Sequence, residues 1–301
     1  MGYSARYHAA SLAAVFVALA IGILIGVGFG SDLVNGTADD LEKSLRSDLD
    51  DKSAQIEDLK SQLADEQQFS SAVAPAVVEN RLQGSQIAIV AFGGLDDALA
   101  DDVQAALEPA GATLREIAVV REPPDEGAIE GVVPRHRQET REEHLTRAAR
   151  LTGQALVRGG AGFDALRSAL FSRYSGNPGG LDGIVIVRAQ PEDMNDRDSS
   201  DSSAIEDGMI DGMQNAFGDI PGAAEVRLVG AERTDTDPSS IGFFMDHGAA
   251  SVDDVDDLSG KVALVYALDG AEGEFGVKDT ADALLPDLLA PVGAGFNGQG
   301  D

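Results

Sequence analysis

The chain has 301 residues, no cysteine and a formal net charge of −30 at pH 7. The lack of cysteine excludes disulfides, thiolate metal sites and a cysteine nucleophile. The acidic balance argues against nucleic acid as a partner, because phosphate neutralisation needs clustered lysine and arginine, and we interpret the acidity as a solvated surface.

An apolar segment from Ala9 to Gly30 holds no ionisable side chain and predicts a membrane-spanning helix. At a rise of about 1.5 Å per residue it would measure roughly 33 Å, close to the roughly 30 Å hydrocarbon core of a bilayer. The alternative is a cleaved secretory signal, but the apolar region of a signal is typically only about 7 to 15 residues. We therefore expect residues 1–35 to be an uncleaved signal anchor in the lipid bilayer. The charges around the span favour a single pass with a cytoplasmic N-terminus and an extracytoplasmic C-terminal part.

Three glycines recur at spacings of four within this segment, at Gly22, Gly26 and Gly30. Such a small-residue face lets two membrane helices approach closely, so these positions are candidates for helix packing. Glycine is also generally frequent in membrane helices, and that interpretation stays open.

Residues 36–70 predict a polar helix with heptad spacing, a coiled-coil stalk. A charged lysine interrupts the apolar seam, which lowers stability but restricts register. We expect a parallel homodimer or a higher oligomer, and the alternative is a solitary amphipathic stalk. Pro75 is expected to end the helix, with residues 71–82 as a linker. The predicted seam consists of Leu45, Leu49, Lys52, Ile56, Leu59 and Leu63.

Residues 83–301 alternate between short apolar runs and helical patterns, which predicts a doubly wound α/β domain with a mostly parallel sheet. The expected strands are Ile87–Phe92, Leu114–Val120, Ile184–Ala189, Val226–Gly230 and Val262–Leu268. The expected helices are a first one from Leu95 to Leu107, then about 139–158, 162–174 and 203–217, and a short last one at 281–285. Long polar loops are expected at 121–134 and 190–202.

Two short patterns resemble ligand-binding loops, and both match poorly. Gly93 and Gly94 precede a helix, as in phosphate-binding turns, but four acidic residues follow and the longer glycine motifs are absent. The acidic stretch from Asp193 to Asp201 could supply oxygen ligands for calcium, but its spacing fails the loop template. We interpret the first as a structural turn and the second as a solvated loop.

Four soft donors form the candidate metal residues. Met209 and Met213 lie one turn apart on a predicted helix, and Met245 with His247 forms a Met-x-His pair. Thioether and imidazole groups suit Cu(I), whereas methionine at helical spacing also serves as core filler and a lone histidine is often structural. Copper is therefore a possible bound or transported ion, and no other cofactor is indicated.

The sequence contains neither a Gly-x-Ser-x-Gly elbow nor a His-Glu-x-x-His motif, so we predict no catalytic residues and no enzyme. The N-terminal segment Tyr7–Phe16, the leucine-spaced stalk, and Ser251–Asp256 followed by Gly260–Val265 resemble the actinobacterial copper transporter family MctB over nearly the full length. The resemblance implies copper efflux and homeostasis in the cell envelope, with an outer-membrane location.

A single span encloses no aqueous path unless several copies assemble, and the sequence lacks the alternating segments of a membrane barrel. Two hypotheses therefore follow. The first is a copper-handling envelope protein. The second is a noncatalytic dimeric scaffold that organises envelope or cell-separation proteins.

Overall fold

The computed structural model describes residues 3–160, 162–191, 193–218 and 226–287, with side chains of the first helix described over 7–27 and from 43 onward. The chain divides into two compact units, Met1–Phe69 and Ser70–Asp301. Each unit is a separate body, and the second contains the sheet.

The first unit is helical and belongs to α1 (Tyr3–Val78). Within it, Tyr7–Val27 is long and apolar enough to cross a membrane, with a mean hydropathy of 2.7 and no buried residue. This confirms the predicted N-terminal apolar helix. A Cβ added at Gly22 or Gly26 would meet nothing within 4 Å, so both positions present bare backbone. The surroundings of Gly30 lie outside the described residues.

The last turns of α1 belong to the second unit and correct the expected linker. The helix passes through Pro75 and ends at Val78, and residues 79–84 form turns. Proline removes one helical hydrogen bond. Here tertiary packing compensates, because Ala74, Val78 and Leu82 are buried in the hydrophobic core of the domain.

The second unit is built on one seven-stranded sheet with the order β3-β2-β1-β4-β5-β6-β7. All neighbouring pairs are parallel except β2 and β3, so the prediction of a mostly parallel sheet is confirmed. At the centre, Ile89 pairs with Ile117 on one side and Val185 on the other. The strands are β1 (Gln86–Gly93), β2 (Thr113–Val120), β3 (Phe171–Gly176), β4 (Gly183–Ala189), β5 (Arg227–Ala231), β6 (Ala250–Val252) and β7 (Glu274–Phe275).

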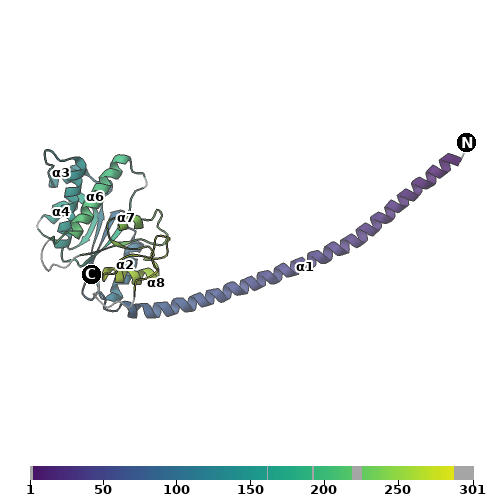
Figure 1. The fold of residues 1–301 in the computed structure, drawn as a ribbon, viewed down its shortest axis with the longest axis horizontal. Coiled ribbons are helices and arrows are strands. Elements are labelled where there is room, and N and C mark those ends of the chain that lie inside the picture. The colour runs from purple at the N-terminus through teal and green to yellow at the C-terminus, as the bar shows by residue number, and fades with distance from the viewer. Residues whose placement is uncertain (1–2, 161, 192, 219–225, 288–301) are drawn as a thin grey trace, which may run out of the picture. The chain divides into compact units, whose positions relative to one another are not determined.

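Helices cover both faces of the sheet, as Figure 1 shows. Alternate residues of β1 explain the two layers. Ala88, Val90 and Phe92 pack on one side with α3 to α7, whereas Ile87 and Ile89 pack on the other with α2, α8 and the end of α1. The helices are α2 (Asp97–Ala110), α3 (Glu126–Val132), α4 (Arg141–Arg158), α5 (Phe163–Leu170), α6 (Asp196–Gln214), α7 (Ile241–Asp246) and α8 (Leu258–Leu268).

Capping residues define the ends of the two helices that the sequence predicted most accurately. Asp96 accepts from the backbone N–H of Ala98 at the start of α2, and Gly111 ends this helix in the left-handed region with φ 79°. Thr140 and Glu143 form a reciprocal capping box at the start of α4. Both helices lie where the sequence predicted them.

Several expected elements are wrong. The apolar run 262–268 lies in α8 and not in a strand, and 281–285 is not helical. The predicted helix 162–174 stops at Leu170, where the edge strand β3 begins. The polar loops are shorter than expected, because α3 lies inside 121–134 and α6 begins at Asp196.

Candidate functional site

The acidic segment after β6, residues 253–256, forms hydrogen bonds with other chain segments at the carboxyl edge of the sheet. Asp253 accepts hydrogen bonds from the backbone N–H groups of Val277 (2.7 Å) and Lys278 (3.1 Å). Asp256 accepts from the backbone and hydroxyl of Thr234, which follows β5. The segment therefore joins the chain after β5 to the chain after β7.

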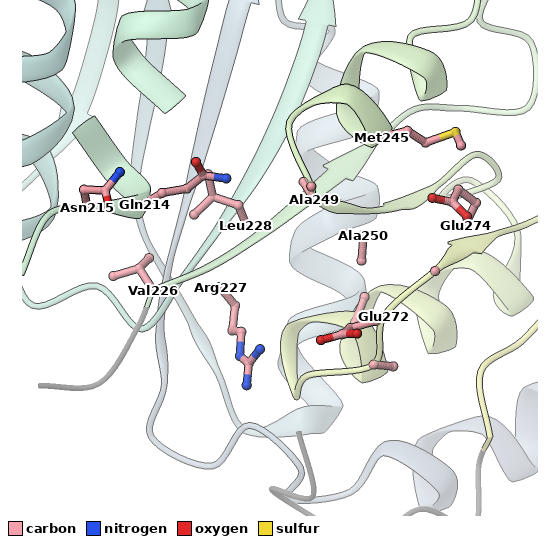
Figure 2. Close-up of a pocket in the computed structure, with 14 residues that line it drawn as sticks. Gln214, Asn215, Val226, Arg227, Leu228, Met245, Ala249, Ala250, Glu272 and Glu274 are labelled. Atoms are coloured by element: carbon pink, nitrogen blue, oxygen red, sulfur yellow. The ribbon is translucent and has the colours of Figure 1, made fainter. Parts of the chain in front are cut away.

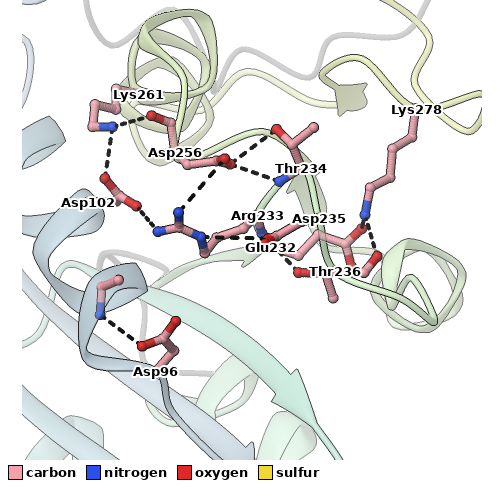
Figure 3. Close-up of polar contacts among 11 residues, drawn as sticks. Asp96, Asp102, Glu232, Arg233, Thr234, Asp235, Thr236, Asp256, Lys261 and Lys278 are labelled. Atoms are coloured by element: carbon pink, nitrogen blue, oxygen red, sulfur yellow. Dashed lines mark hydrogen bonds and ion pairs between the residues drawn. The ribbon is translucent and has the colours of Figure 1, made fainter.

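Ion pairs reinforce this edge, as Figure 3 shows. The carboxylate of Asp102 on α2 binds Arg233 at 2.6 Å and Lys261 of α8 at 3.0 Å. Glu232, which is buried, binds Lys278 at 2.5 Å and accepts from Ser239 and from the backbone of Ser240. These carboxylates have protein partners and form a structural network. Within the segment that carried the family resemblance, Asp254 differs, because its buried Oδ1 has no hydrogen-bond partner among the described residues.

A second polar cluster lies near the carboxyl ends of β1, β2 and β4. Here the strand order reverses direction, and this is the position where open α/β sheets usually bind ligands. Arg188 at the end of β4 binds the buried Glu206 of α6 at 2.7 Å, and Gln190 donates to the same carboxylate at 2.9 Å. The Arg188 guanidinium lies over the Phe243 ring, 4.5 Å from its centroid.

Glu122, just beyond β2, belongs to the same cluster, because its charge interacts with those of Glu206 and Arg188. Both of its carboxyl oxygens are buried and have no hydrogen-bond partner among the described residues. Burial raises the pKa of Glu122 to about 8, the charge of Glu206 adds to the rise, and Arg188 opposes it. Burial also raises the pKa of Glu206, against the opposing effect of Arg188. Arg188 is therefore the cation that offsets two buried carboxyls.

The two weak loop motifs have structural roles. Gly93 has φ 84°, and an added Cβ would overlap the backbone of Ala189 on β4. In the acidic stretch 193–201, Asn195 caps α6, and Asp201 is buried against Arg141. The first motif is the structural turn that the sequence predicted. The solvated-loop interpretation of the second is wrong, because residues 196–201 lie in α6 and Asp201 is buried.

The four candidate soft donors do not form one cluster. Met209 and Met213 of α6 are fully buried in the core, whereas Met245 is 48% exposed at the end of α7. The Nδ1 of His247 lies 2.8 Å from the carbonyl oxygen of Phe243, and its Nε2 lies 3.0 Å from a carboxylate oxygen of Asp207. A metal bound to this ring would have to replace one of the two contacts.

Met245 lines a cavity of about 550 Å³ at the amino ends of β5, β6 and β7 (Figure 2). Gln214 and Asn215 from the end of α6 line it too, as do Arg227, Glu272 and Glu274. The sequence did not predict this cavity, because its lining residues come from six separate stretches of the chain. Among the described residues, no group of three or more His, Cys, Asp or Glu side chains is placed to hold a metal ion.

The fold defines an α/β protein of the doubly wound class with an N-terminal helix able to cross a membrane. The family described as "Copper transport outer membrane protein, MctB" matches residues 3–286, and the chain belongs to this family.

Curated relatives share only part of this length. The copper transporter MctB of Mycobacterium bovis is 34% identical over 102 residues, which are 34% of this chain and 32% of the relative. The same values hold for copper transporter MctB of two Mycobacterium tuberculosis strains. The aligned stretch therefore spans about a third of each of these relatives.

Proposed function

We propose that the chain is a single-pass envelope protein that binds copper outside the cytoplasm and contributes to its efflux. The observation that carries the proposal is membership of the copper transport family along almost the whole chain. The apolar helix Tyr7–Val27 supplies the membrane anchor. With a cytoplasmic N-terminus, the unit from Ser70 onward lies on the side to which copper is exported.

The four soft donors differ in how accessible they are to a copper ion. Met245 offers a thioether that an ion can reach at the wall of the cavity, and thioethers favour Cu(I). Met209 and Met213 are inaccessible without opening the core. His247 can add an imidazole nitrogen only after it gives up Asp207 or the Phe243 carbonyl. Met245 is therefore the proposed first contact of the ion.

Replacing Met245 with leucine is expected to weaken Cu(I) binding by the full-length chain about tenfold or more, since the loss of one metal ligand costs at least about 1.4 kcal/mol. Competition titration in detergent micelles against a chromogenic Cu(I) chelator measures this. Met209→Leu is the matched control, because it removes a buried thioether at nearly constant volume. Equal affinity in the two variants would contradict the assignment of Met245.

The cellular test is copper content in a strain that lacks the gene. Copper retention and copper sensitivity are expected to rise, and the wild-type chain is expected to restore both. Unchanged copper content in the deletion strain would overturn copper efflux as the function.

A second candidate function is a noncatalytic dimeric scaffold for other envelope proteins. The observation that favours it is the apolar seam on α1, where Leu45, Leu49, Ile56, Leu59 and Leu63 are 51–66% exposed. Their heptad positions let a second copy cover them, with Lys52 limiting the register. A parallel pair would also bring Gly22 and Gly26 of the two spans together.

The absence of native cysteine makes this seam easy to test. In a parallel pair, Ile56→Cys in the full-length chain is expected to form a disulfide between copies on mild oxidation, because position 56 faces its counterpart. The control Asp58→Cys lies away from the seam and is expected to stay monomeric on a non-reducing gel. Equal yields of dimer from both variants, or none from either, would contradict the paired stalk.

A further inference from the structure

β3 is an edge strand whose outer side is open. It lies at the end of the strand order, and among the described residues its backbone pairs only with β2. Arg173 to Gly176 pair with β2 in unbroken register, and all of them except the half-buried Tyr174 are exposed. In an antiparallel pair, every second residue directs its N–H and C=O groups away from the neighbouring strand. The outer side of β3 therefore offers backbone donors and acceptors to an added strand.

The opposite edge of the sheet differs, because the chain covers it with its own backbone. β7 is short, and the segment that follows it returns along its outer side. The backbone N–H groups of Asp282 and Ala283 donate to the carbonyl oxygen of Glu274, and that of Gly276 donates to the carbonyl oxygen of Ala283. Of the two outermost strands, only β3 thus keeps a free side within the described structure.

Four arginines contact β3 or the residue that follows it. One belongs to the strand, and one lies 5.3 Å from the centroid of the Tyr174 ring. The other two donate to backbone carbonyl oxygens at the start and just past the end of the strand, at 3.4 and 3.1 Å. In this order they are Arg173, Arg167, Arg121 and Arg115. Residues 113–176 carry ten arginines and nine acidic residues, so this part of the chain lacks the acidic excess that gives the protein its net charge of −30.

Acidic groups offset only part of the arginine charge at this edge. Two exposed carboxylates form ion pairs of 3.1 and 3.2 Å, and exposed pairs are weak. Glu116 is buried beside the strand and accepts from the Tyr174 hydroxyl at 2.5 Å. Burial raises the pKa of Glu116 to about 7, which removes part of its charge near neutral pH. The two exposed pairs are Asp97 with Arg173 and Asp164 with Arg167.

We propose that the open edge of β3 binds an extended acidic peptide segment of a partner protein, which adds to the sheet as a strand next to β3. Backbone hydrogen bonds hold such a strand, and the side chains that alternate along it select the partner. Carboxylates of the peptide pair with Arg167 and Arg173, whose planar guanidinium groups suit carboxylate geometry. A second copy of this chain is a poor occupant, because pairing β3 with β3 brings two sets of arginines together. The proposal is independent of copper binding.

The probe is a short peptide of alternating Glu and Thr, and its charge control alternates Lys and Thr. Fluorescence anisotropy with the full-length chain in nanodiscs of neutral lipid is expected to show binding of the Glu peptide and none of the Lys peptide. A Glu peptide that is methylated on its backbone nitrogens keeps its charges but has no backbone donors, and it is expected to bind at least tenfold more weakly. No binding of the Glu peptide, or equal binding of any two of the three peptides, would overturn the proposal.

Hydrogen exchange locates the bound peptide on the protein without any substitution. Exchange of the backbone amides at 172–176 is expected to slow when the Glu peptide is added, because the outward N–H groups become donors to the new strand. Binding that left the exchange of these amides unchanged would contradict strand addition at β3.

Substitutions test the role of the arginines. The double variant Arg167→Glu and Arg173→Glu is expected to lower the affinity for the Glu peptide at least tenfold. The matched control Arg135→Glu and Arg137→Glu reverses two exposed arginines in the loop before α4 and is expected to bind as the wild type does. Unchanged affinity in the first variant, or an equal loss in both, would contradict recognition by the arginines at the edge of β3.

Discussion

Replacing Gly208 with alanine is expected to destabilise the α/β unit by about 3 kcal/mol, near the upper end of ordinary overpacking costs. The reason is the close contact between α4 and α6. A Cβ at Gly208 would overlap the backbone of Thr146, and one at Gly212 would overlap the backbone of Arg150. From the other side, a Cβ at Gly153 would lie 2.5 Å from the carbonyl oxygen of Met209. Backbone meets backbone here, so no side-chain rotation relieves the overlap.

Urea unfolding of the full-length chain in detergent, followed through the loss of tertiary signal, measures this effect. Gly131→Ala is the control, because its Cβ would meet nothing within 4 Å in α3. In that helix alanine is expected to stabilise by up to about 1 kcal/mol. If Gly208→Ala, like the control, left the unfolding midpoint unchanged or raised it, the result would contradict the close contact between α4 and α6.

The spacing of these glycines in the sequence already indicated a close helix contact, and this signal was missed. Gly208 and Gly212 lie four positions apart, the spacing that marks close helix contacts in membranes. The same segment carries Met209 and Met213, which were candidate soft ligands. The structure buries both methionines fully in the core that this contact creates. The glycine spacing was the stronger signal in this helix.

The doubly wound fold was predictable because β1, β2 and β4 are short runs rich in Val and Ile. The run 262–268 is also continuously apolar but belongs to a helix that is buried on nearly all sides. Periodicity does not distinguish these two cases over seven residues. Asp257 before α8 was the available sign of a helix start.

The candidate sites were harder to predict, because they depend on exposure and on distant segments. The sequence gives Met209 and Met245 the same chemistry, and only packing leaves one buried and the other accessible. Likewise, Arg188 is a single charge at the end of the apolar β4, and its partner Glu206 follows 18 residues later. An arginine in such a strand indicates a buried partner without identifying it.

Replacing Arg188 with methionine is expected to destabilise the α/β unit by about 3–5 kcal/mol at pH 8, because it leaves the buried Glu206 without its cation. Methionine keeps an apolar contact with Phe243, so the loss is mainly one of charge. Arg173→Met is the control. It breaks the exposed pair with Asp97 and is expected to cost less than about 1 kcal/mol.

The loss of stability in Arg188→Met is expected to depend on pH. The pKa values of the neighbouring carboxyl groups determine its direction. Glu206 and Glu122 have pKa values above 4.5 in the folded protein, and Arg188 opposes both shifts. In the variant the folded state therefore holds these protons to higher pH, whereas the unfolded chain releases them near pH 4.5. Stability falls as pH rises between those values, so the deficit is small at pH 4 and largest at pH 8 and above.

Adding Glu206→Gln to Arg188→Met is expected to recover a large part of the stability at pH 8, because the uncompensated charge is then absent. Urea unfolding of the single and double variants at pH 4, 6 and 8 measures the coupling between the two side chains. A deficit in Arg188→Met that stayed constant from pH 4 to pH 8 would contradict the charge-offsetting role. In that case, the contribution of Arg188 would come from its packing on Phe243 rather than from its charge.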